Sequence, residues 1–328
     1  MNIVMSGSGS GGHIYPCLSL YRKLKDDHNV ILVIFKEIDK KIYDLNKVNY
    51  TYIDNNLSFF EKYKKIRKII IENKIEKSIT FGGKNSLIIN LVAKSLNKKI
   101  FIFEQNVILG KANKINYLLC DKVFSNFKLN LKKEINVGNP NSFEISNEKV
   151  NYFNNNKITI LITLGSLGSS SVNKVIEQFI IDNKTYNIIY VTGNNVKSNL
   201  KDNDHTKIIN YFNPLTTLMN SSDIIISRAG ASTLSEIIQL NKVSIIIPSI
   251  YVSNNHQYKN AIRLYKIKGI ELIQEKELNV NLLKSKLFIL TNNNKYYEFI
   301  KTNLNLVKKS NGFDKILKEI DRWLFIRI

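Results

Sequence analysis

The feature that most constrains this chain is an alternation of short β-branched runs with amphipathic helical stretches. Strand–helix alternation of this kind predicts a parallel sheet covered by helices on both faces. In the first part of the chain we expect strands at residues 2–5, 30–35, 50–53, 78–81, 100–103 and 122–124, with helices such as 14–24 and 86–96 between them.

The alternation stops at a polar, asparagine-rich segment and then begins again. After that segment we expect strands at residues 158–164, 186–191, 207–209, 223–227 and 243–247, and a helix from Val172. The sequence therefore predicts an α/β protein with two similar Rossmann-like domains, a number that suits 328 residues. We place the first domain at residues 1–139, a linker at 140–156 and the second domain at 157–311. The segment 312–328 is expected to pack back on the first domain or to contact lipid.

The composition limits the class of protein less sharply than the alternation does. The chain has 48 Lys and Arg against 27 Asp and Glu, a net charge of +21, which favours polyanionic partners. It is also rich in Lys, Asn and Ile and has only 4 Pro, as an AT-rich genome would produce, so part of the charge reflects that bias. No aromatic-interleaved basic patch indicates nucleic-acid binding. Without a membrane-length apolar run, a signal-peptide pattern or metal-type cysteine spacing, we expect a cytoplasmic protein without disulfides.

The first glycine-rich loop allows two interpretations. Gly7, Gly9 and Gly12 satisfy the G-x-G-x-x-G pattern of a dinucleotide-binding turn. An NAD enzyme also needs an acid at the end of the second strand, where Glu37 is displaced. His13 follows the loop at a predicted helix start, a position suited to proton transfer. An NAD-dependent oxidoreductase therefore remains an alternative.

Further polar loops follow predicted strands, where ligands of open α/β sheets bind. LGSLGSSS (residues 164–171) can cradle a phosphate, but it lacks the GK[ST] of an NTPase P-loop. In SRAGASTLSEI, Thr233 and Glu236 fit a helix capping box, although Glu236 could instead hold a ribose diol. The remaining loops of this kind are FGGKNS (81–86), FEQN (103–106) and PSIYVSNNHQYKNA (248–261).

Taken in this order, the loops resemble the MurG family, the N-acetylglucosaminyltransferases of peptidoglycan synthesis. The resemblance covers residues 1 to about 275. Its motifs are GSGGHIYP, FGGKNS, FEQN with GKANK, GNP, LGSLGS, SRAGASTLSE and NNHQYKNA. It implies a GT-B fold, two Rossmann-like domains that face a cleft. It also implies inverting, metal-free and cofactor-free transfer of GlcNAc from UDP-GlcNAc to the MurNAc C4 hydroxyl of lipid I. The enzyme would be peripheral, on the cytoplasmic side of the cell membrane.

The resemblance also implies roles for individual residues. His13 would be the general base, and Gly11 and Gly12 would face the acceptor diphosphate. Glu236 would bind ribose, and the backbone of Phe212 would meet uracil. The full set that we assign to UDP-GlcNAc binding is Ser10, Gly11, Gly12, Asn106, Ser166, Phe212, Ala231, Ser232, Thr233, Glu236, His256 and Gln257. The acceptor set is Gly82, Gly83 and Lys84.

The chain departs from the family pattern at three places. After GNP the family commonly has an arginine, whereas this chain has Ser142. Phe103 stands where a histidine often precedes EQN, and Lys84 stands where an aromatic residue is common. Lys84 could supply the missing positive charge. An inactive homologue, or a related UDP-sugar-dependent glycolipid glycosyltransferase, therefore also stays open.

One predicted helix carries both apolar and basic side chains. Residues 56–77 place Phe59 and Phe60 among several lysines, a pattern typical of helices on anionic membrane surfaces. A helix with its apolar side against the sheet would show the same pattern. Phe59 and Phe60, together with the apolar residues 107–109, favour some lipid contact.

Overall fold

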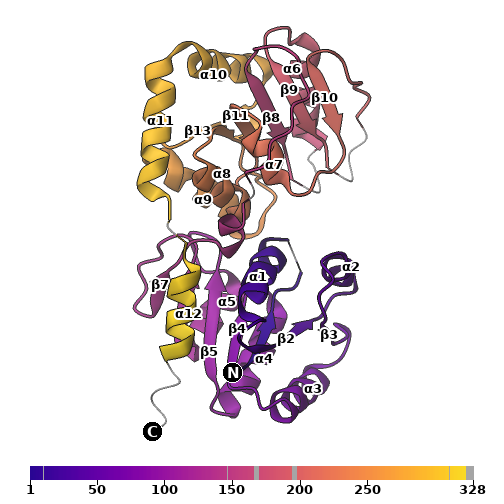
Figure 1. Ribbon diagram of the computed structural model, residues 1–328, viewed down its shortest axis with the longest axis vertical. Coiled ribbons are helices and arrows are strands. Elements are labelled where there is room, and N and C mark those ends of the chain that lie inside the picture. The colour runs from indigo at the N-terminus through magenta and orange to yellow at the C-terminus, as the bar shows by residue number, and fades with distance from the viewer. Residues whose placement is uncertain (10, 146, 166–169, 194–197, 310, 323–328) are drawn as a thin grey trace. The chain divides into compact units, whose positions relative to one another are not determined.

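The computed structural model describes residues 1–328 except 10, 146, 166–169, 194–197, 310 and 323–328. The chain divides into two compact units (Figure 1). The first comprises residues 1–144 and 309–328, and the second comprises residues 145–308. Each unit is built on a sheet whose named strands all pair in parallel, as the strand–helix alternation predicts.

The first unit has seven strands in the order β3-β2-β1-β4-β5-β6-β7. The strands are β1 (Asn2–Ser6), β2 (Asn29–Ile34), β3 (Thr51–Tyr52), β4 (Lys77–Thr80), β5 (Lys99–Glu104), β6 (Lys122–Ser125) and β7 (Glu134–Asn136). The helices are α1 (Gly11–Leu24), α2 (Glu37–Leu45), α3 (Phe59–Glu72), α4 (Lys84–Ser95), α5 (Lys111–Leu119), the 3-10 turn η1 (Pro140–Phe143) and α12 (Phe313–Arg322).

Successive residues of the central strands of this unit enter different cores, because side chains alternate across a strand. Ile3 and Met5 of β1 join a cluster with α1 and α12, whereas Val4 joins a cluster with α3 and α4. Both cores are apolar, so these strands are buried on both faces, as expected for a parallel sheet covered by helices.

The C-terminal helix belongs to the first unit. Phe313, Ile316 and Ile320 of α12 are buried in the same cluster as α1. The approach is close at Gly312, where a β-carbon would lie 1.8 Å from the carbonyl oxygen of Val137. Any larger residue at position 312 would therefore displace the helix.

The η1 turn lies in the segment that we expected to be linker. Phe143 packs edge-on against Phe313, with ring centroids 5.7 Å apart. The Oγ of Ser142, which is buried, donates to the carbonyl oxygen of Asn139. The chain thus remains part of the first unit through Glu144.

The second unit has six strands in the order β10-β9-β8-β11-β12-β13. The strands are β8 (Thr159–Thr163), β9 (Asn187–Val191), β10 (Thr206–Ile209), β11 (Ile224–Ser227), β12 (Val243–Ile246) and β13 (Glu271–Leu272). The helices are α6 (Ser170–Asp182), α7 (Leu215–Asn220), α8 (Ala231–Leu240), α9 (His256–Lys266), α10 (Val280–Asn292), α11 (Asn294–Val307) and the turns η2 (Ser253–Asn255) and η3 (Glu275–Glu277). Among the helices that the structure describes, none is both long and apolar enough to span a membrane.

Candidate active site

The strand order fixes where each unit can bind a ligand. In the first sheet the chain winds outward from β1 in one direction and from β4 in the other, so these neighbours form a topological switch point. In the second sheet β8 and β11 are the equivalent pair. Ligands of open α/β sheets bind beyond the carboxyl ends of the strands at such points. Loops that the sequence singled out follow all four strands.

His13 lies in the first turn of α1, beside the switch point of the first unit. Its Nδ1 is 3.3 Å from the carbonyl oxygen of Ser8, which can only accept a hydrogen bond. The contact therefore assigns the proton to Nδ1 and leaves Nε2 as the basic nitrogen. Nε2 faces the loop after β4, since a β-carbon on Gly82 would lie 3.2 Å from it.

The surroundings of His13 keep its imidazole neutral near pH 7. Burial lowers the pKa of His13 below its ordinary value of 6.5, and the positive charge of Lys36 acts in the same direction. The hydrogen bond to Ser8 and the carboxylates of Glu104 and Asp39 oppose this shift. A neutral imidazole can accept a proton, as a general base must.

The loop after β4 brings the predicted acceptor residues next to the first loop. Gly82 and Gly83 adopt φ angles of 89° and 84°, which favour glycine. A β-carbon on Gly83 would lie 3.3 Å from the carbonyl oxygen of Ser8. Lys84 is the first residue of α4, and its side chain is exposed.

A buried carboxylate organises the FEQN loop. Glu104 is 2% exposed and accepts hydrogen bonds from the backbone and side-chain nitrogens of Asn106, at 3.0 and 3.1 Å. It also accepts from the Gly110 N–H and from the Asn113 side chain, both at 2.9 Å. A β-carbon on Gly82 would lie 3.7 Å from Asn113 Nδ2, so this cluster adjoins the His13 site.

Helix α8 carries the predicted donor residues of the second unit. Ala231, Ser232 and Thr233 form its first turn after the N-cap Gly230, and Glu236 lies one turn further. The capping-box interpretation of Thr233 and Glu236 is wrong, because Thr233 is inside the helix rather than at its N-cap. Residues three or four apart share a helix face, so Glu236 lies on the side of Ser232 and Thr233.

Further described donor candidates lie in the second unit, whereas Gly11, Gly12 and Asn106 of the same predicted set lie in the first. His256 and Gln257 begin α9, and Gln257 Oε1 accepts from the Ser249 N–H at 2.9 Å. Phe212 is partly exposed between β10 and α7. Ser10 and Ser166, the other two predicted residues, lie outside the described part of the chain.

An ion pair that the sequence analysis missed connects the loops of the second unit. Arg228, directly after β11, donates to Glu275 Oε2 at 2.8 Å and to the carbonyl oxygen of Ile247 at 3.1 Å. The two charged side chains are only 8% and 5% exposed. The pair therefore joins the ends of β11 and β12 to the η3 turn. No local pattern marks Glu275, 47 residues away, as the partner.

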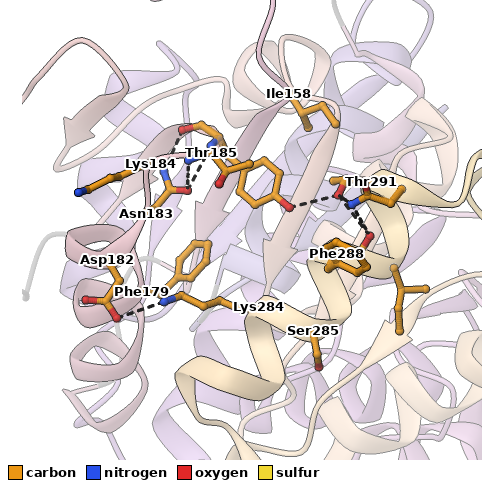
Figure 2. Close-up of a pocket in the computed structure, with 13 residues that line it drawn as sticks. Ile158, Phe179, Asp182, Asn183, Lys184, Thr185, Lys284, Ser285, Phe288 and Thr291 are labelled. Atoms are coloured by element: carbon orange, nitrogen blue, oxygen red, sulfur yellow. Dashed lines mark hydrogen bonds and ion pairs between the residues drawn. The ribbon is translucent and has the colours of Figure 1, made fainter.

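The pocket in Figure 2 lies at the amino ends of the strands of the second sheet, opposite the ends that carry the candidate site. It measures about 790 Å³ and includes Ile158 and Tyr186, which precede β8 and β9. Tyr186 contacts Thr291 through their hydroxyl groups, 3.1 Å apart, and Lys284 pairs with Asp182 at 3.3 Å. None of the predicted site residues that the structure describes lines it. Its place at the amino ends of the strands separates it from the candidate site.

Comparison with known proteins identifies the family. Residues 3–125 match the glycosyltransferase family 28 N-terminal domain, and residues 159–320 match the family 28 C-terminal domain. Relatives from Caldicellulosiruptor saccharolyticus and Fusobacterium nucleatum are 31% and 32% identical, over 99% and 98% of this chain and 98% of each relative. Both are named UDP-N-acetylglucosamine--N-acetylmuramyl-(pentapeptide) pyrophosphoryl-undecaprenol N-acetylglucosamine transferase. The chain belongs to the MurG family of glycosyltransferases.

Solved structures agree with a MurG-type fold. The crystal structure of Acinetobacter baumannii MurG matches with a TM-score of 0.80 over 98% of this chain and 100% of that one, at 18% identity. A Staphylococcus aureus MnaA–UDP structure matches with a TM-score of 0.74 over 98% and 96%, at 14% identity. At such identities the likeness shows the fold alone. The predicted GT-B fold class is confirmed.

We predict that Arg228→Met lowers the unfolding free energy of the second unit by about 3 kcal/mol, because it removes the buried cation that pairs with the buried Glu275 carboxylate. Urea denaturation measures the effect. The double variant Arg228→Met/Glu275→Leu should recover most of the loss. Lys284→Met, which breaks the exposed pair with Asp182, is the matched control and should cost less than about 1 kcal/mol. Equal losses for Arg228→Met and Lys284→Met would contradict the prediction.

Proposed function

We propose that the chain transfers GlcNAc from UDP-GlcNAc to the C4 hydroxyl of the MurNAc unit in lipid I, and produces lipid II and UDP for peptidoglycan synthesis. Two relatives that are named as this N-acetylglucosamine transferase are 31% and 32% identical over nearly the full length of the chain, which supports the choice of substrates. The observation that carries the chemistry is the geometry of His13, whose Nδ1 proton is assigned by Ser8 while Nε2 remains basic.

His13 would act as the general base. As the C4 oxygen bonds to the anomeric carbon of GlcNAc, His13 Nε2 takes the hydroxyl proton. The bond between the anomeric carbon and the UDP oxygen breaks, and its electron pair leaves with UDP. Attack from the face opposite UDP inverts the anomeric configuration. The lowered pKa of His13 keeps the base unprotonated at neutral pH.

The amino end of α8 would bind the donor. The unpaired N–H groups and positive dipole end of a helix stabilise the charge that develops on a departing diphosphate. Ser232 and Thr233 would add hydroxyl donors to this helix end, and Ser166 would lie near the phosphates. Glu236, almost fully buried on the same face, would accept from the ribose hydroxyls. His256 and Gln257 would contact the GlcNAc hydroxyls, and the backbone of Phe212 would contact uracil.

The acceptor diphosphate would meet glycine N–H groups and Lys84 in the first unit. Ser142 replaces the arginine of the family pattern and carries no charge. Its hydroxyl is also unsuited to bind a ligand, because the residue is 4% exposed and donates to Asn139. Lys84 is exposed at the amino end of α4, directly after Gly82 and Gly83. It is therefore placed to supply positive charge beside the switch point.

An exposed apolar surface on three helices of the first unit would contact the membrane. In α3, Ile66 and Ile70 pack in the core, but Phe59 and Phe60 are 48% and 75% exposed. The neighbouring helices α4 and α5 add further exposed apolar residues: Leu91, Ile115 and Leu118. Helix α3 also carries exposed cations, namely Lys64, Lys65, Arg67 and Lys68. Aromatic side chains among cations suit an anionic lipid surface, which we place on the cytoplasmic side of the cell membrane.

We expect His13→Ala to lower kcat by about 100-fold or more, because positioned proton transfer contributes about 10²–10⁴-fold. UDP release from UDP-GlcNAc with a lipid I analogue measures it. For the parent enzyme, kcat/KM should fall on acidification with an apparent pKa below 6.5, since protonation of His13 removes the base. Normal turnover in His13→Ala would refute the base assignment.

Transfer of labelled sugar to diacylglycerol instead of lipid I would indicate the glycolipid enzyme, and tight NAD binding would indicate the oxidoreductase.

We expect Lys84→Ala to raise the KM for the lipid I analogue several-fold and to leave the KM for UDP-GlcNAc unchanged, because the lost charge faces the acceptor alone. Lys94→Ala, in the last turn of the same helix, is the matched control and should change neither constant. An unchanged acceptor KM in Lys84→Ala would contradict the role.

We expect the protein to float with anionic vesicles more than with neutral ones, and Phe59→Ser/Phe60→Ser to weaken that flotation. Ile38→Ser on α2, an exposed apolar residue outside this surface, is the control and should float like the parent. Equal flotation with both lipid compositions, or none, would remove the membrane proposal.

A further inference from the structure

Helix α2 holds the glycine loop that precedes His13. The carboxylate of Asp39, in the first turn of α2, is 1% exposed and accepts a hydrogen bond from the hydroxyl of Ser8. It also accepts from the Gly9 N–H, with oxygen distances of 3.2 and 3.3 Å. One turn later, the Tyr43 hydroxyl donates to the carbonyl oxygen of Gly7 at 2.7 Å. Three successive loop residues are therefore bound to one helix.

Ser8 transmits this restraint to the imidazole. Its hydroxyl binds Asp39, and its carbonyl oxygen accepts from His13 Nδ1. Gly9, with a φ angle of 102°, adjoins Ser8 and gives the loop conformational freedom that the carboxylate must limit. If the Ser8 carbonyl moved, His13 would lose the hydrogen bond that fixes both its tautomer and the orientation of its ring.

We propose that Asp39 is a positioning residue for the reaction, because it fixes through Ser8 the tautomer and the direction of the His13 base. The inference rests on the proposed function, in which His13 is that base. Asp39 reaches the reacting atoms only through Ser8 and His13. Orientation errors of about 1 Å in such a group cost about 10²-fold in rate.

The charge of Asp39 gives the role a measurable signature. Charged groups reach His13 from three elements: Glu104 from β5, Lys36 from the end of β2 and Asp39 from α2. A carboxylate stabilises the protonated imidazole and so raises the pKa of His13. Removing the Asp39 charge therefore lowers that pKa and moves the acidic limb of the pH–rate profile to lower pH.

The test compares Asp39→Asn, Asp39→Ala and Ser8→Ala with the parent, in UDP release with a lipid I analogue. Asp39→Ala should lower kcat about 10- to 100-fold and leave the KM for UDP-GlcNAc within about twofold, because the proposed donor contacts of α8 and α9 lie in the second unit. The near-isosteric Asp39→Asn should lose less and should shift the acidic limb to lower pH. Ser8→Ala keeps the carbonyl but loses the tether, so its kcat should fall between the parent and Asp39→Ala. Asp44→Asn removes an exposed carboxylate from the same helix and should behave as the parent.

A double variant separates positioning from a general structural role. If Asp39 acts through His13, then Asp39→Ala should cause no further loss in a His13→Ala background. A full additional loss in that background would overturn the inference. It would also be overturned if Asp39→Asn, Asp39→Ala and Ser8→Ala all kept the kcat and the pH profile of the parent while His13→Ala was impaired. Parent turnover in His13→Ala would instead refute the proposed base. Thermal melting identifies a variant that fails to fold, and Asp39→Asn and Ser8→Ala then decide the question.

Discussion

In a parallel sheet every strand ends at the same edge, and this constraint places the candidate site in both units. The loops after β1 and β4 meet because these strands are neighbours in the first sheet. Ile3 of β1 pairs with Lys77 of β4, although the two residues are far apart in the sequence. The same holds for β8 and β11 in the second sheet. Helix starts follow these strand ends, so each unit presents N–H groups and glycines where a diphosphate needs them.

Buried carboxylates hold these loops in shape. Asp39 accepts from the Gly9 N–H, Glu104 accepts from the N–H groups of Asn106 and Gly110, and Glu275 accepts from Arg228. Hydrogen bonds to an ionised acceptor are stronger than neutral ones, and a buried donor that loses its partner is costly. Loops with several glycines can therefore keep a single conformation without bulky side chains that would exclude the ligand.

The sequence predicted what repeats locally and missed what depends on distant partners. Strand–helix alternation was sufficient for the other strands of both sheets, because periodicity reports burial, but the edge strands β7 and β13 were not predicted. His13 and Glu236 could be proposed as site residues because they follow glycine loops in the sequence. Asp39 and Glu275 were not, because an acidic residue in a helix or turn has the same local pattern whether it is solvated or buried against a loop. The apolar residues of α3 likewise suited both core and membrane, and the structure divides them between buried Ile66 and exposed Phe60.

In the proposed function one loop serves both a base and an anion, and the placement of charge around His13 suits both roles. Two carboxylates near the ring raise its pKa, against the larger effect of burial, and they would repel a diphosphate if they faced it. Both are buried and accept hydrogen bonds from N–H groups of the loops. Their negative charge is therefore satisfied within the protein and does not face a bound ligand. Lys36 has the opposite arrangement: its side chain is exposed, and a β-carbon on Gly9 would lie 3.3 Å from its ammonium nitrogen. A cation there lowers the pKa of His13. In the proposed function the same charge would attract an anionic acceptor, so it would favour both the neutral base and the bound substrate.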